Sequence, residues 1–243
     1  MSGKYSKKYL IRTYECDKKS QLRLVTLMNI FQDIADEQAA ILGLGLDFCL
    51  EHGMAWVGSN YHLQIFRMPK LHEEIILTTW PAVEKKLGAI RDFSVSDSQG
   101  NEIIRASSQW ILIDVTKKRP ISLRDNLPQY QVVDDRVMNE DFNSRLSDVA
   151  RDDYRMIFNV RFDDIDINNH VNNAVYPLWA SEAVSADFRQ NKEISEIEIS
   201  FKKEGLYGET VEVITQINGD ETLHRISAQT DGRELSRVRI LWK

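Results

Sequence analysis

The chain has 243 residues, a formal net charge of −6, 42% hydrophobic residues and 28% charged residues. This composition is that of a folded globular protein and argues against a disordered or fibrous chain, while the negative charge argues against general nucleic-acid binding. No window approaches about 18 consecutive apolar residues, so we expect no membrane span.

The N-terminal residues MSGKYSKKYLIRTYECD contain lysines but no apolar run after them, so we expect neither a secretory signal nor a transit peptide. Cys16 and Cys49 are the two cysteines, and neither belongs to a CxxC pair. Two such cysteines favour a reducing, cytoplasmic setting.

The first half of the chain begins with an extended segment from Tyr9 to Tyr14. The segment from Leu24 to Gln38 follows, and its apolar residues recur at three- and four-residue spacing, which predicts a helix. Alternation of apolar and polar residues then predicts four strands: Trp56–Phe66, Glu73–Thr79, Ala89–Ser96 and Ile103–Val115. Between helix and strands lies an apolar, glycine-rich insert, Gly43–Gly53, which either packs as a loop on its own core or forms the lid or wall of a pocket.

The polar stretch from Arg124 to Asp153 has no sustained period and is typical of a linker, either free or crossing over the sheet. The second half repeats the order of the first. An extended segment, Tyr154 to Phe162, precedes a helical pattern that includes Val175, Leu178, Trp179, Glu182, Ala183 and Ala186. Four predicted strands follow: Ile194–Phe201, Thr210–Ile217, Thr222–Gln229 and Glu234–Trp242.

A short internal repeat supports this duplication. Residues 100–106 have the pattern G-x-E-I-x-R-A, and residues 232–238 have the pattern G-x-E-L-x-R-V, at an offset of 132 residues. Each glycine precedes an alternating segment that ends near a tryptophan, which is typical of a hairpin. We therefore predict an α+β fold of two tandem hotdog halves, in which antiparallel sheet wraps around long helices. The predicted boundaries are 1–124, a linker at 125–152, and 153–243.

The segment Asp163–Asn173 is rich in Asp and Asn and contains His170. A helix N-cap explains one or two of these residues. A calcium loop starting at Asp164 fails because its sixth position is Asn169 and its twelfth is Val175. The five histidines show no zinc-ligand spacing, so we expect no metal site.

A hydrolytic site explains more of the segment. If it is extended, Asp166, Asn168 and His170 share one face, while Ile165 and Ile167 point toward a core. An acid, an amide and an imidazole then lie just before a helix N-terminus, whose free N–H groups can polarise a carbonyl. The other four histidines have no such neighbours, and we expect surface or satisfied core positions for them.

The same residues resemble the acyl-ACP thioesterase family, whose pattern D-x-N-x-H-x-N-N is matched by Asp166, Asn168, His170, Asn172 and Asn173. The resemblance continues with Tyr176, Trp179 and Glu182, and with first-half segments such as Gly88–Phe93. The family's catalytic glutamate corresponds to Glu204. The resemblance spans nearly the whole chain, although a hotdog fold alone would be weak evidence of function.

The sequence departs from the family at Gly205, where the family often has cysteine. A thiolate mechanism is therefore not expected, and we expect buried structural roles for Cys16 and Cys49. We expect Glu204 and His170 to activate a water, and Asn168 with backbone N–H groups to hold the thioester carbonyl. Asp166 either orients this network or attacks directly to give a mixed anhydride.

The resemblance implies hydrolysis of fatty acyl-acyl carrier protein to free fatty acid and holo-ACP, with no cofactor. The implied partner is an acidic acyl carrier protein with a phosphopantetheine-linked acyl chain, for which Lys202 and Lys203 are candidate contacts. The first half would shape the acyl pocket and the second would supply the catalytic groups. Two alternatives stay open: an acyl-CoA thioesterase, and a non-enzymatic hotdog protein that binds acyl thioesters. A homodimer also stays open.

Overall fold

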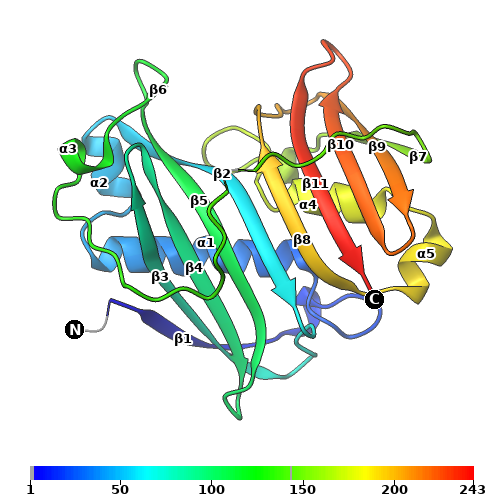
Figure 1. Ribbon diagram of the computed structural model, residues 1–243, viewed down its shortest axis with the longest axis horizontal. Coiled ribbons are helices and arrows are strands. Elements are labelled where there is room, and N and C mark those ends of the chain that lie inside the picture. The colour runs from blue at the N-terminus through cyan, green and yellow to red at the C-terminus, as the bar shows by residue number, and fades with distance from the viewer. Residues whose placement is uncertain (1–2, 143) are drawn as a thin grey trace. The chain divides into compact units, whose positions relative to one another are not determined.

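The computed structural model describes residues 3–142 and 144–243. The chain divides into two compact units, residues 1–142 and 143–243, and each contains one antiparallel set of strands with helices (Figure 1). Within these described ranges, every helix is too short or too polar to cross a membrane.

The first unit is built on strands in the order β1-β3-β4-β5-β2. Their bounds are β1 (Tyr5–Leu10), β2 (Met54–Ile65), β3 (Glu74–Lys85), β4 (Gly88–Asp97) and β5 (Glu102–Asp114), with the short β6 (Arg119–Pro120) beside β5. The unit also contains the 3-10 turn η1 (Thr13–Glu15) and the helices α1 (Leu24–Ile41), α2 (Leu46–Glu51) and α3 (Leu123–Asn126).

Helix α1 packs on this sheet because its apolar residues lie on one stripe. Leu27, Met28 and Phe31 are all completely buried, and the Phe31 ring stacks on Phe93 of β4 with centroids 4.7 Å apart. Each such side chain contributes about 1.5–3 kcal/mol by leaving water. The sheet face under α1 is thereby the core of the first unit.

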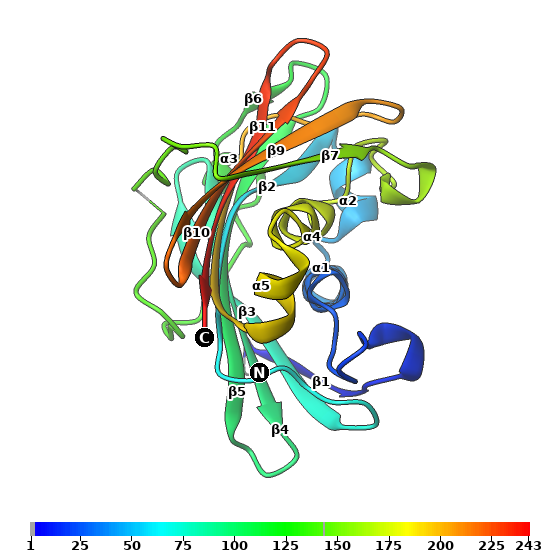
Figure 2. The same ribbon diagram turned by 90° about the vertical axis from the view of Figure 1, so that its right-hand side faces the viewer.

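The second unit has the strand order β8-β11-β10-β9-β7. Its strands are β7 (Tyr154–Asn159), β8 (Ile194–Phe201), β9 (Thr210–Asn218), β10 (Glu221–Ala228) and β11 (Glu234–Trp242). It also contains the 3-10 turn η2 (Phe162–Asp164) and the helices α4 (Val175–Glu182) and α5 (Ala186–Asn191), which lie on one face of these strands (Figure 2). Tyr176 and Trp179 of α4 are buried against the sheet.

Most predicted elements are confirmed, and two strands, Ile194–Phe201 and Glu234–Trp242, match residue for residue. The extended segment predicted from Tyr9 to Tyr14 is wrong, because the strand ends at Leu10 and a 3-10 turn follows. The second predicted helix is also too long. It ends at Glu182, and α5 begins separately after the N-cap Ser185, whose hydroxyl accepts a hydrogen bond from the Phe188 N–H.

The polar stretch between the halves does not hang free. In the first unit, the Arg136 Nε donates to the fully buried carboxylate of Asp92 at 2.9 Å, and the Trp80 indole donates to the Asp135 carbonyl at 2.9 Å. In the second unit, Ala150 N–H donates to the Gln216 side chain at 2.8 Å. Each end of the stretch is therefore held against the strands of its own unit.

Candidate functional site

Asp166, Asn168 and His170 lie on one tight turn between η2 and α4 in the second unit. The Asp166 N–H donates to the His170 carbonyl at 2.9 Å, and the Asn169 N–H donates to the Asp166 carbonyl at 3.0 Å. Asn169 has a positive φ of 62°, a conformation that Asn tolerates better than most residues. The Asp166 carboxylate accepts the Asn168 N–H at 2.8 Å, which is the side-chain bond typical of an Asx turn.

The prediction that this segment is extended is therefore wrong. Its polar residues bond to the local backbone, and that competes with strand formation. Ile167, which we expected to point toward a core, is 79% exposed at the tip of the turn. Asp166 and Asn168 are neighbours because of the turn and not because of strand alternation.

His170 and Glu204 face each other, with 3.1 Å between His170 Nε2 and Glu204 Oε2. Their side chains are 35% and 63% exposed, so the pair is accessible to a substrate. Glu204 lies in the connection between β8 and β9. The next residues on the two segments hold them together, because the Val171 N–H donates to the Gly205 carbonyl at 2.9 Å.

Tyr176 of α4 provides a second link to the same connection. Its hydroxyl accepts the Gly205 N–H at 3.0 Å, and burial raises the pKa of Tyr176 to about 12, so the phenol is neutral. Both backbone groups of buried Gly205 are thus bonded within the site. A Cβ at this position would lie 2.9 Å from Val171 Cγ2 and 3.2 Å from the Tyr176 oxygen, so this chain has no room there for the cysteine common in the family.

The structure brings the four predicted residues together as two pairs, Asp166 with Asn168 on the turn, and His170 of the turn with Glu204 of the β8–β9 connection. Within the described residues, no hydrogen bond joins the side chains of the two pairs. The side-chain amide of Asn168 lies 3.5 Å from Asp166 Oδ2, at the limit of a hydrogen bond. The amide is therefore able to bind another acceptor.

The backbone N–H groups at the start of the helix are less available to a substrate carbonyl than predicted. Helix α4 begins at Val175, and the side chain and carbonyl of Asn172 accept the N–H groups of Ala174 and Val175, both at 2.9 Å. Sequence reasoning missed this role of Asn172 and that of Gly205. An Asx residue just before a helical pattern is a signal for the first, whereas Gly205 meets its partners only in the folded chain.

Four large side chains on this turn, on η2 before it and on the segment after Gly205 remain exposed: Phe162 (77%), Ile167 (79%), Leu206 (44%) and Tyr207 (64%). The rings of Phe162 and Tyr207 contact each other edge to face, with centroids 5.9 Å apart. Of the two lysines considered as partner contacts, Lys202 pairs with Glu234 at 2.8 Å, whereas Lys203 is exposed. Exposed rings in contact with each other are typical of a binding surface.

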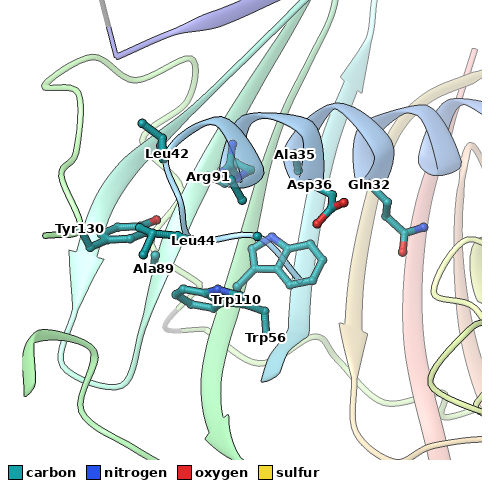
Figure 3. A pocket seen from close by; sticks show the side chains of 12 residues that line it. Gln32, Ala35, Asp36, Leu42, Leu44, Trp56, Ala89, Arg91, Trp110 and Tyr130 are labelled. Atoms are coloured by element: carbon teal, nitrogen blue, oxygen red, sulfur yellow. The ribbon is translucent and has the colours of Figure 1, made fainter. Parts of the chain in front are cut away.

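A mainly apolar cavity lies inside the first unit, between α1 and the sheet (Figure 3). Gln32 and Asp36 of α1 line it together with the rings of Trp56 and Trp110, and buried Arg91 lies on its wall. The rest of its lining consists of Ala35, Ala39, Leu42, Leu44, Gly45, Ala89 and Tyr130. Trp56 and Trp110 are only half-buried, and both line this cavity.

The insert Gly43–Gly53 packs on its own core and also forms part of the cavity wall. It forms α2 and packs on its own core through Leu44 and Cys49, and Leu44 with Gly45 also lines the cavity. Cys16 and Cys49 are free and buried, and burial raises the pKa of both thiols, as expected for structural cysteines.

We predicted surface or satisfied core positions for the other four histidines. This holds for His52 and His72, which are exposed, and for His224, which is fully buried between two threonine hydroxyls. His62 is half-buried instead, with its Nδ1 3.0 Å from Glu140.

Two family models match the chain. The model of the acyl-ACP thioesterase N-terminal domain matches residues 2–130, and that of the C-terminal domain matches residues 147–243. The chain is 25% identical to oleoyl-acyl carrier protein thioesterase 1 of Arabidopsis thaliana, over 98% of the chain and 76% of that protein. It is 25% identical to a palmitoyl-acyl carrier protein thioesterase of Cuphea hookeriana, over 98% of the chain and 62% of that protein.

Solved structures show the same fold. An acyl-ACP thioesterase from Bacteroides thetaiotaomicron superposes with a TM-score of 0.89 at 22% identity, over 99% of this chain and 98% of that one. The 12:0-ACP thioesterase of Umbellularia californica superposes with a TM-score of 0.88 at 22% identity, over 99% of this chain and 97% of that one. The predicted α+β fold of tandem hotdog halves is thereby confirmed.

Proposed function

This chain belongs to the acyl-ACP thioesterase family, and from that membership we propose that it hydrolyses the thioester bond of fatty acyl-acyl carrier protein. The products would be a free fatty acid and holo-ACP. The observation that carries the proposal is the accessible pair His170 and Glu204, 3.1 Å apart, beside the Asp166–Asn168 turn.

The His170–Glu204 contact suggests how water is activated. A carboxylate at Nε2 favours the tautomer with its proton on Nε2, and that leaves the Nδ1 lone pair free to accept a proton. Water deprotonated by Nδ1 attacks the thioester carbonyl, while Glu204 stabilises the imidazolium that forms. The thiol of the leaving group has a pKa of about 8.5, so the thiolate can leave with little help from a general acid.

Asn168 is our candidate for holding the carbonyl oxygen. Its side chain is exposed, and its amide makes only the long 3.5 Å contact with Asp166. An amide N–H donor at the developing oxyanion is worth roughly 100- to 1000-fold in rate in comparable sites. The N–H groups of Ala174 and Val175 are already bonded to Asn172, so they contribute less than the sequence suggested.

We propose that the cavity of the first unit receives the acyl chain, because apolar side chains make up most of its wall. We propose that the carrier protein contacts the exposed apolar side chains around the turn, with Lys203 as the nearby cation. A cytoplasmic location and a homodimer are not needed for this chemistry and stay predictions.

The test is thiol release from acyl-ACP and matching acyl-CoA substrates with chains of C8 to C18. We expect preference for acyl-ACP, and we expect His170→Ala to lower kcat by roughly 100- to 10,000-fold. His52→Ala, which removes an exposed histidine in the other unit, serves as the matched control. Preference for acyl-CoA would keep the chemistry but change the carrier, and no release from any substrate would refute the enzyme and favour a binding protein.

A further inference from the structure

The segment that joins α1 to α2 exposes four large aliphatic side chains. Residues 41–50 have the sequence ILGLGLDFCL, which contains one charged residue. Ile41, Leu42, Leu46 and Leu50 are between 38% and 68% exposed, and we call these four side chains the aliphatic corner. Leu46 and Leu50 are four residues apart on α2, so they lie on the same side of that helix.

The aliphatic corner is compact because the two helices touch where they are joined. The Leu44 N–H donates to the Ala39 carbonyl at 2.8 Å, which closes the end of α1. A Cβ at Gly45 would lie 2.9 Å from Ala40 Cα, so the start of α2 packs directly against α1. The side chains of the corner therefore form one patch, and exposed apolar patches are typical of sites that bind a protein or a membrane.

The same segment forms part of the wall of the cavity in the first unit. Leu44 and Gly45 line the cavity, and Leu42 lines it while 48% exposed, so the corner lies at the edge of the cavity (Figure 3). Each CH2 group of an acyl chain favours a bilayer over water by about fourfold. A fatty acid that leaves this cavity is therefore far more stable in a bilayer at the corner than in water.

Basic side chains lie beside the corner, on the hairpin between β5 and β6. The Val115 N–H donates to the Gly53 carbonyl at 3.0 Å, and this bond fixes the hairpin next to the end of α2. Figure 1 shows α2 and β6 at the same end of the first unit. Lys118 and Arg119 are exposed on the hairpin, and neither forms an ion pair with any residue that the structure describes. These two cations are complementary to the headgroups of anionic phospholipids.

We propose that the aliphatic corner docks on a phospholipid bilayer that contains anionic lipid. The corner would enter the boundary between headgroups and acyl chains, while Lys118 and Arg119 contact the headgroups. Helix α2 also carries the exposed acids Asp47 and Glu51, so the attraction comes from the hairpin and not from the helix. Use of the cavity by an acyl chain rests on the proposed function, whereas the docking itself needs no substrate.

Co-sedimentation of the protein with vesicles tests the aliphatic part of this surface. The vesicles contain either phosphatidylcholine alone or equal parts of phosphatidylcholine and phosphatidylglycerol. We expect the double variant Leu46→Gln, Leu50→Gln to bind the mixed vesicles at least about tenfold more weakly, because glutamine keeps the length and helix preference of leucine but loses its apolar surface. The matched control is Leu10→Gln with Ile157→Gln, at positions 53% and 54% exposed on β1 and β7, which should bind like the wild type.

The basic part of the surface is tested with the double variant Lys118→Gln, Arg119→Gln. One basic residue near an anionic surface strengthens binding by about fivefold, so we expect binding to the mixed vesicles to weaken by roughly 25-fold. Binding to vesicles of phosphatidylcholine alone should equal that of the wild type. Added salt should weaken the binding of the wild type to mixed vesicles in the same direction. Unchanged binding of this variant to mixed vesicles would overturn the assignment to anionic lipid.

The inference is overturned if the wild type binds neither kind of vesicle. It is also overturned if the Leu46→Gln, Leu50→Gln variant binds like the wild type. If that variant does not fold, Leu50→Gln alone replaces it, with an expected loss of about threefold; equal binding then overturns the inference.

Two measurements without vesicles separate the other possible results. A wild type that is a dimer by sedimentation velocity, with a monomeric Leu46→Gln, Leu50→Gln variant, would show that a second copy covers the corner, and this overturns the inference. Thiol release from acyl-ACP is measured separately. A wild type that binds vesicles but releases no thiol would refute the proposed function and support the docking, so the two failures are distinguishable.

Discussion

Acidification should destabilise the second unit through His224, which is buried in a closed hydrogen-bond network. Its Nδ1 lies 2.8 Å from the Thr215 hydroxyl, and its Nε2 lies 2.7 Å from the Thr222 hydroxyl. Thr215 donates to the Ala183 carbonyl at 2.7 Å, so it accepts from Nδ1–H. Thr222 accepts the Trp242 indole N–H at 2.9 Å and can donate to Nε2. The network thus fits a neutral histidine with its ring proton on Nδ1.

The effect on stability follows from the pKa difference between the folded and unfolded states. Burial lowers the pKa of His224 from 6.5 to about 3 in the folded chain. Below pH 6.5 the unfolded chain binds a proton here that the folded chain does not, so stability falls as the pH falls, down to about pH 3. Each pH unit costs about 1.4 kcal/mol, so this histidine alone removes about 3 kcal/mol between pH 6.5 and pH 4.5.

Urea unfolding followed by tryptophan fluorescence at several pH values from 8 to 4.5 measures this loss. We expect His224→Gln to be less stable than the wild type at pH 8 but to lose less stability on acidification, by about 3 kcal/mol at pH 4.5. His52→Gln, at an exposed position, should follow the wild type because that side chain lies outside the network. Parallel pH dependences for the wild type and His224→Gln would refute the assignment of a buried neutral histidine.

Two further predictions concern space in the structure. Gly205→Ala places a Cβ 2.9 Å from Val171 Cγ2 and 3.2 Å from the Tyr176 oxygen. We therefore expect a loss of about 1–3 kcal/mol in unfolding free energy and slower thiol release. An unchanged melting temperature and rate would contradict this packing. Ala89→Phe fills the first-unit cavity, so the preferred acyl chain should become shorter in the substrate panel; an unchanged preference would show that the chain binds elsewhere.

Regular strands and the long helix of the first unit were predictable from sequence, because side chains in these elements repeat with periods of 2 and about 3.6 residues. The strands Ile194–Phe201 and Glu234–Trp242 have the predicted bounds, and the apolar stripe that begins at Leu24 is α1. The motif D-x-N-x-H located the turn by resemblance. The same period-two reasoning failed at the turn itself, where Asx side chains bond the local backbone and Ile167 is exposed.

The sequence by itself determined the order of elements, the duplication and the identity of the polar residues at the turn, because all of these are local patterns. Only the tertiary structure decided which residues meet. The contact of His170 with Glu204 follows from the Val171–Gly205 bond, which joins residues 34 positions apart in the chain.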